Sequence, residues 1–305
     1  KSRICTSMRS ALRCLSVAGR MAGGQGGQRV SFSTVPMRKG KVIDTAGMVK
    51  VSGIKPNGTT KRFYKEVSIG PMGDGWTVML DGRPLITEDK HRFIVPTASA
   101  ASAIAYEWDV QGERIKPFVM PLMSLAATAI DVDRKKIVGK LLKYVDTDSL
   151  CYRVDSPASL AKMQKKFWDP VLNYFRDEHG LTIYTTEGIA SLSQPAETKL
   201  EIARFIDETS NFELACLKAV AEVGYSTMLG IAVIHRKVSL KDTYNAAMAE
   251  RLFQVRKWGE VKGPYGHGIE LEYPRLHIAS AINLLNLIHD DFAPLASKTT
   301  VYEEP

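Results

Sequence analysis

Most sequence patterns that mark an enzyme or a metal site are missing from this 305-residue chain. No glycine-rich loop precedes a Lys-Ser or Lys-Thr pair, which excludes a P-loop for nucleotide phosphates. The six histidines fall in no metal-ligand spacing, and no serine has the sequence context of a nucleophile elbow. The sequence therefore gives weak support for an enzyme and none for a metal or cofactor.

Cysteines and long apolar runs are also scarce. Of the four cysteines, Cys5 and Cys14 lie near the start, while Cys151 and Cys216 are too far apart for a metal motif and suggest no disulfide framework. This usage fits a reducing compartment. The longest apolar run, residues 223–234, is shorter than the ~20 residues that cross a bilayer, so we expect no membrane insertion.

Acidic residues are absent from residues 1–43, which hold nine lysines and arginines. Removing these nine from 41 basic residues leaves 32, against 33 acidic residues in the rest of the chain. A segment rich in Arg, Ser and Ala without acids is typical of a mitochondrial presequence, although a disordered basic tail is the alternative. We therefore expect import into the mitochondrial matrix. We expect no nucleic-acid partner, because the remaining chain has no basic excess.

The rest of the chain changes from strand signals to helix signals. Residues 44–61 have no periodicity and are predicted to be a linker. Alternating and β-rich stretches predict short antiparallel strands at 62–69, 76–80 and 92–95, joined by turns at 71–75 and at Asp81-Gly82. Capping residues and helical spacing then predict helices, at 97–112, 120–130, 135–144, 156–178 with a break at Asp169-Pro170, 195–208, 212–223, 225–235, 240–258 and 274–288.

This succession predicts an α+β fold with two domains and a tail. A small β-rich N-terminal domain spans 62–150, an all-helical domain spans 151–290, and a C-terminal tail follows at 291–305. Two carboxylates near a thiol, in Asp146, Asp148 and Cys151, suggest an alternative function as a matrix enzyme. The competing interpretation is that an acid or Thr147 ends or caps a helix there while Cys151 packs inside.

The predicted helix 240–258 has an apolar stripe and a separate polar face. Leu240, Tyr244, Ala247, Val255 and Trp258 form the stripe. Glu250, Phe253 and Lys257 lie away from it, and Gln254 lies between the two faces. Glu250 is then either a solvated helix position or an exposed carboxylate offered to a partner's backbone or arginine.

Eight ordered segments together resemble one protein family. They are Arg62-Phe63-Tyr64-Lys65, Leu80-Asp81-Gly82-Arg83, Glu107-Trp108-Asp109 with Gln111, Met120-Pro121-Leu122, Ala129-Ile130-Asp131, Asp146-Thr147-Asp148 with Leu150-Cys151-Tyr152-Arg153, Gln164 with Trp168-Asp169-Pro170, and Glu250, Gln254 and Trp258-Gly259. The set is similar to the mitochondrial ATP synthase assembly factor 2 family, over roughly residues 62–290.

The resemblance implies a chaperone without nucleotide hydrolysis. Members of the family bind the unassembled alpha subunit of the F₁-ATPase and prevent its aggregation before it pairs with beta. The resemblance also implies a small α+β domain joined to an orthogonal helical bundle. We expect the protein to be a monomer. By the family's motif Glu250 is the functional glutamate, and we place Phe253, Gln254 and Lys257 with it in the partner-binding surface. The other motif residues are expected to be structural framework: Trp108, Asp148, Arg153, Trp168, Asp169 and Trp258.

Overall fold

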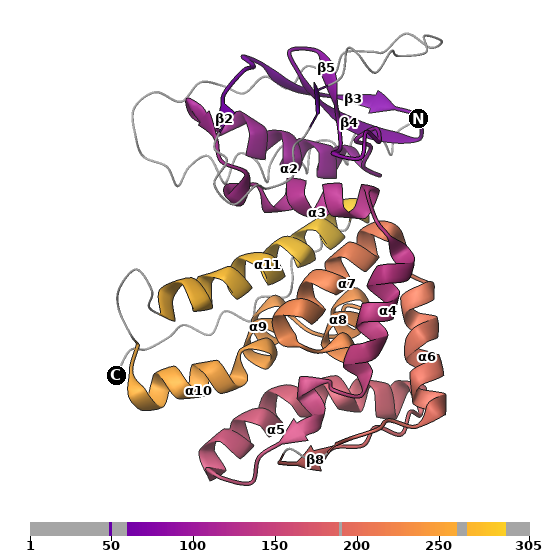
Figure 1. Ribbon diagram of the computed structural model, residues 1–305, viewed down its shortest axis with the longest axis vertical. Coiled ribbons are helices and arrows are strands. Elements are labelled where there is room, and N and C mark those ends of the chain that lie inside the picture. The colour runs from indigo at the N-terminus through magenta and orange to yellow at the C-terminus, as the bar shows by residue number, and fades with distance from the viewer. Residues whose placement is uncertain (1–48, 51–59, 189–190, 261–266, 291–305) are drawn as a thin grey trace, which may run out of the picture.

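The computed structural model describes residues 49–50, 60–188, 191–260 and 267–290. A small sheet lies at one end and helices fill the rest, as the α+β prediction requires (Figure 1). The predicted presequence and C-terminal tail lie outside the described residues. The division into domains at residue 150 stays a prediction.

The sheet has four strands in the order β1-β5-β4-β3. The antiparallel hairpin of β3 and β4 turns at Gly73-Asp74, within the predicted turn. The strand bounds are β1 Val49–Lys50, β3 Val67–Met72, β4 Gly75–Leu80 and β5 Arg83–Ile86. Helix α2, Ala98–Asp109, packs against β3 and β4 and begins where predicted, because the Thr97 side chain accepts a hydrogen bond from Ala100 N.

Three features of this region differ from the expectations. Strand β5 was not predicted, and the expected strand at 92–95 forms only isolated bridges, of which Trp76–Val95 is one. Strands β1 and β2 also fall inside the predicted linker: β1 pairs in parallel with β5, and β2 pairs with β6. Strands of two residues form because the backbone of another strand lies close enough to pair with them. They are too short to show an alternating pattern in the sequence. Their remaining bounds are β2 Thr60–Lys61 and β6 Arg114–Ile115.

The helices form one continuous core with the sheet domain through α3 and α11. Helix α3 lies between the sheet end and the bundle (Figure 1). The 3₁₀ helices are η2 Pro117–Val119 and η3 Ser149–Cys151, and η4 Tyr174–Glu178 is a π-helical turn. The helix bounds are α3 Pro121–Ile130, α4 Arg134–Val145, α5 Ala158–Asn173, α6 Ala196–Asp207, α7 Asn211–Gly224, α8 Thr227–Ile234, α9 Leu240–Ala247, α10 Ala249–Trp258 and α11 His267–Ile288.

Helix α8 is the centre of the bundle, and seven of its eight residues are buried. It packs closely on α7 at Gly230. A Cβ atom at this glycine would lie 2.9 Å from the Leu217 carbonyl oxygen, so a larger residue would push the two helices apart. Within the described part of the chain, no helix is long and apolar enough to span a membrane.

Two helix predictions need correction. Pro170 does not break α5, because Trp168, Val171 and Leu172 on either side of it are buried and hold the helix against the core. The predicted helix 240–258 is two helices, α9 and α10, which meet at Met248. Met248 and Ala249 are both buried, so core packing fixes this bend without a proline or glycine to mark it.

Candidate partner-binding surface

Helix α10 carries all four residues predicted to bind a partner. It packs on α5 and α9, and only Ala249 among its ten residues is buried. Glu250 and Gln254 are exposed, Lys257 is exposed, and Phe253 is half-buried. The structure therefore places the four side chains on one short helix at the protein surface.

The exposed Glu250 side chain is oriented by a hydrogen bond to the fold. Its Oε1 accepts a hydrogen bond of 2.9 Å from Nε2 of Gln164 on α5. Gln164 is buried, and its own Oε1 accepts from the backbone N–H of Val154 at 3.0 Å. Within the described residues, Oε2 of Glu250 has no hydrogen-bond partner, so the carboxylate is oriented by the fold and has one oxygen left for an external donor.

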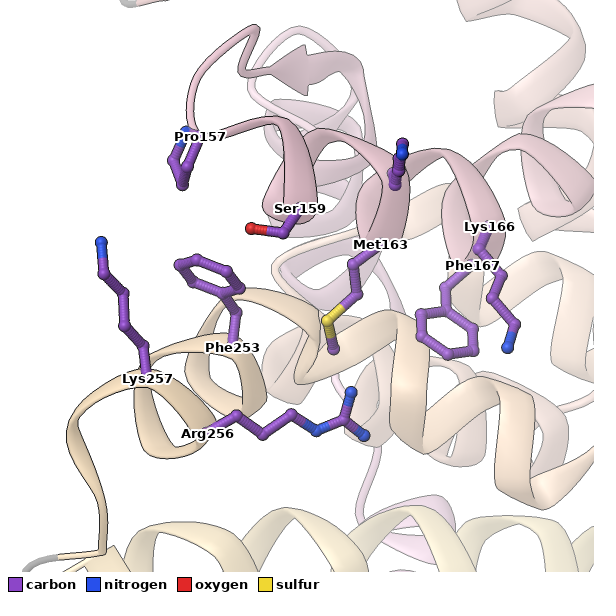
Figure 2. A pocket seen from close by; sticks show the side chains of 9 residues that line it. Pro157, Ser159, Met163, Lys166, Phe167, Phe253, Arg256 and Lys257 are labelled. Atoms are coloured by element: carbon purple, nitrogen blue, oxygen red, sulfur yellow. The ribbon is translucent and has the colours of Figure 1, made fainter.

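A groove of about 620 Å³ lies between α5 and α10. Figure 2 shows the side chains of Met163, Phe167 and Phe253 turned into this space. Pro157 and Ser159 lie at one end, beside Phe253. Four cations also line the groove: Lys162, Lys166, Arg256 and Lys257. The predicted residues Phe253 and Lys257 thus share a groove with residues of α5 that lie 86 or more positions before Phe253 in the sequence.

The groove residues on α5 were not predicted from the sequence. Ser159, Lys162, Met163, Lys166 and Phe167 follow the spacing of one helix face, which was the signal that could have indicated them. The break predicted at Pro170 hid that continuous face. Which helix lies opposite could not be read from spacing.

Trp258 was predicted to be part of the structural framework, but it lies at the surface. Its side chain is 69% exposed at the end of α10, with the Lys257 ammonium 5.2 Å from its ring centre. The bend at Met248 carries the end of α10 away from the core, so the predicted apolar stripe does not continue to Trp258. The ring extends the exposed surface around Gln254 and Lys257.

Trp168 and Arg153 join separate segments of the fold. The buried Trp168 ring donates from Nε1 to the Ala246 carbonyl at 2.8 Å, joining α5 to α9. The Arg153 guanidinium lies 5.2 Å from that ring and forms an ion pair of 2.9 Å with Asp169. Asp169 therefore holds the Arg153 side chain in place.

Asp148 and Trp108 are also buried. The Asp148 carboxylate accepts from Leu150 N and from Met228 N, both at 3.1 Å, and so caps η3 and the start of α8 together. Burial raises the pKa of Asp148 to about 6 despite these hydrogen bonds. Trp108 packs edge-on against Tyr64 at 5.7 Å, and its Nε1 has no hydrogen-bond partner within the described residues.

The alternative catalytic site at Asp146, Asp148 and Cys151 does not form. Cys151 is fully buried, and burial raises the pKa of its thiol, which disfavours the reactive thiolate. Asp146 points to Lys199, 2.6 Å away, rather than to the thiol. Among the described residues no group of His, Cys, Asp and Glu could hold a metal ion.

The chain is similar to known proteins that are described as chaperones. A family model described as ATP12 chaperone protein matches residues 61–176. The curated relative "Protein ATP12, mitochondrial" of Saccharomyces cerevisiae is 26% identical over 257 residues, which cover 67% of this chain and 78% of the relative.

Two solved structures share the fold as well. Atp12 from Paracoccus denitrificans is 28% identical with a TM-score of 0.67, covering 75% of this chain and 98% of that one. The Atu1473 protein of Agrobacterium tumefaciens is 29% identical with a TM-score of 0.69, covering 75% of this chain and 87% of that one. Over these ranges the chain is similar to proteins of the ATP12 family.

The family model and the Agrobacterium tumefaciens protein are both described as chaperones rather than as enzymes. The match by the family model ends within the π-helical turn after α5, before α10 begins. Helix α5 and the Gln164 side chain thus lie inside the matched region, while Glu250 lies outside it. The structure joins the two through the hydrogen bond between Gln164 and Glu250.

Proposed function

We propose that this ATP12-family chain binds the unassembled alpha subunit of the mitochondrial F₁-ATPase in the matrix. Acting as a monomer, it holds alpha in a soluble form until alpha pairs with beta. Binding of this kind needs no nucleotide, only a surface that competes with aggregation. The family assignment and the mitochondrial relative support the proposal.

The observation that carries the proposal is the exposure of α10. Only one of its residues is buried, and it displays a carboxylate, an amide, an ammonium and two aromatic rings. Transient interfaces combine polar and aromatic side chains, and Trp is enriched among the residues that dominate binding energy. We assign Glu250, Phe253, Gln254 and Lys257 to this contact surface and add Trp258.

Glu250 is the best-defined contact on this surface. The Gln164 amide holds one carboxylate oxygen, so the side chain is already oriented before a partner binds. Its free oxygen suits an arginine or a backbone N–H of the client, because charge-assisted hydrogen bonds are strong and directional. A lysine at this position would place an ammonium against the Gln164 NH₂ group and repel an incoming cation.

Dilution of denatured alpha subunit into solutions of the purified full chain tests the proposal. We expect the wild type to suppress light scattering from alpha, and Glu250→Lys to need about tenfold more protein for the same effect, a loss of about 1.4 kcal/mol of binding. The matched control is Glu187→Lys, which reverses the charge of an exposed side chain on β8 (Thr186–Glu187). This variant should behave as the wild type does.

Thermal unfolding by circular dichroism checks that both variants fold. If folded Glu250→Lys protects alpha as well as the wild type, Glu250 is not a contact. If the folded wild type leaves alpha to aggregate, the assignment of alpha as client is wrong.

A further inference from the structure

The groove between α5 and α10 combines an apolar interior with an entirely basic set of charged side chains. Met163, Phe167 and Phe253 supply the apolar surface, and Pro157 extends it. Every charged residue that lines the groove is a lysine or an arginine (Figure 2). Two apolar helix faces left apart in this way present a surface that a partner side chain can bury.

The four cations have no acidic partner within the described residues. Exposed lysines and arginines elsewhere on the bundle do form ion pairs, such as Lys140 with Glu222 and Lys237 with Glu178. No such pair forms at Lys162, Lys166, Arg256 or Lys257; Lys257 lies instead over the ring of Phe253 at 5.9 Å. Four like charges around one groove repel each other, and an incoming carboxylate would relieve this repulsion.

We propose that this groove binds an acidic amphipathic segment of the client polypeptide. Aliphatic or aromatic side chains of the segment fill the space between Met163, Phe167 and Phe253. Its carboxylates pair with lysines on α5 along one edge and with Arg256 and Lys257 on α10 along the other. The inference rests on the proposed chaperone function and adds the chemistry of the segment that is recognised.

Two other occupants fit the groove less well. A second copy of this chain would present the same cations, and like charges do not attract. A membrane with anionic lipids would satisfy the cations, but the apolar side chains lie between two helices rather than on a protruding face, where lipid chains do not reach them. A single polypeptide segment enters such a space, as in helix-in-groove recognition.

Binding of two labelled peptides to the full chain tests the chemistry. One is an amphipathic peptide with glutamates on one face and leucine and phenylalanine on the other, and the second has lysines in place of the glutamates. We expect fluorescence anisotropy to show binding of the first peptide only, weakened by added salt because the charges lie at the surface. Equal binding of both peptides would overturn the proposal, as would binding of phosphatidylserine vesicles without binding of the acidic peptide.

Charge reversal locates the site. The double variant Lys166→Glu with Arg256→Glu should weaken the acidic peptide at least about tenfold, since it removes one cation from each edge and adds two repulsive charges. Lys135→Glu with Lys136→Glu on α4 changes the net charge equally, away from the groove, and should bind nearly as the wild type does. Unchanged binding by the groove variant, with a wild-type melting temperature, would overturn the site.

The same variants in the alpha-aggregation assay separate the two proposals. If the wild type protects alpha and the groove variant protects it equally well, the groove proposal fails and the chaperone proposal stands. If the wild type binds the acidic peptide in the groove but does not protect alpha, the choice of alpha as client fails alone. Photo-crosslinking from Ser159→p-benzoylphenylalanine identifies the captured client segment, and a segment without acidic residues would contradict the proposed chemistry.

Discussion

The Gln164 amide on α5 donates to the Glu250 carboxylate on α10 at 2.9 Å and links two helices whose residues are 86 positions apart. The same glutamine is buried and holds the Val154 backbone through its oxygen. One side chain therefore fixes both the position of a surface carboxylate and the chain segment after β7, Tyr152–Arg153. The surface around Glu250 depends on a buried residue that does not itself face a partner.

Replacing Gln164 should cost more stability than replacing Glu250. Gln164→Leu leaves the Val154 N–H without its acceptor in a partly buried place and should lower the free energy of unfolding by about 2 kcal/mol. Glu250→Gln keeps an oxygen that accepts from Gln164 and should cost less than about 1 kcal/mol. Urea unfolding measures both. Equal losses for the two variants would mean that the bond to Val154 contributes nothing.

Trp168 and Trp258 should respond in opposite ways to truncation. Trp168→Ala removes a buried ring and its hydrogen bond to Ala246, and we expect a loss of about 3–5 kcal/mol in the free energy of unfolding. Trp258→Ala changes an exposed side chain and should stay within about 0.5 kcal/mol, while weakening the capture of alpha. A large loss of stability in Trp258→Ala, seen in the same denaturant titration, would place that ring in the core after all.

The buried Glu107 carboxylate should make stability depend on pH. Burial raises its pKa from 4.5 to about 7, partly offset by hydrogen bonds from Leu122 N and Met123 N at the start of α3. Because the folded state binds this proton more tightly than the unfolded state, the stability from Glu107 is full below about pH 4.5 and is lost as the pH rises through 7.

Comparison with Glu107→Gln isolates this effect. The free energy of unfolding of wild type minus that of the variant should fall by about 3 kcal/mol between about pH 4.5 and about pH 8. Denaturant titrations at several pH values give both curves. Parallel curves would show that the carboxylate is not held in a raised-pKa environment.

Cys151 should be inert in the native protein. Its thiol is fully buried and its pKa is raised by burial, so iodoacetamide should modify it only after unfolding. Peptide mass spectrometry before and after denaturation measures the modification at this residue. Cys151→Ala should also protect alpha as well as the wild type does. Rapid native alkylation together with loss of function in the variant would revive a catalytic role.

Signals local to a few residues predicted much of the fold. The Thr97 cap and Pro121 at the first position of α3 mark real helix starts, because capping depends on hydrogen bonds within one turn. The turn between β3 and β4 was also predicted from local residues, at 71–75. Pro170 misled the prediction because a proline is ordinarily a break, whereas here buried neighbours on the same helix outweigh the lost hydrogen bond.

The sequence by itself indicated the resemblance to a family, the order of a small sheet followed by helices, and the weak case for catalysis. It also placed Glu250, Phe253, Gln254 and Lys257 close together, since they lie within two turns of one helix. Only the tertiary structure decided that α10 turns away at Met248, that Trp258 is exposed and that α5 lies opposite Phe253. The reason is physical: exposure and grooves depend on which faces of distant segments pack together, and helical spacing describes only one segment at a time.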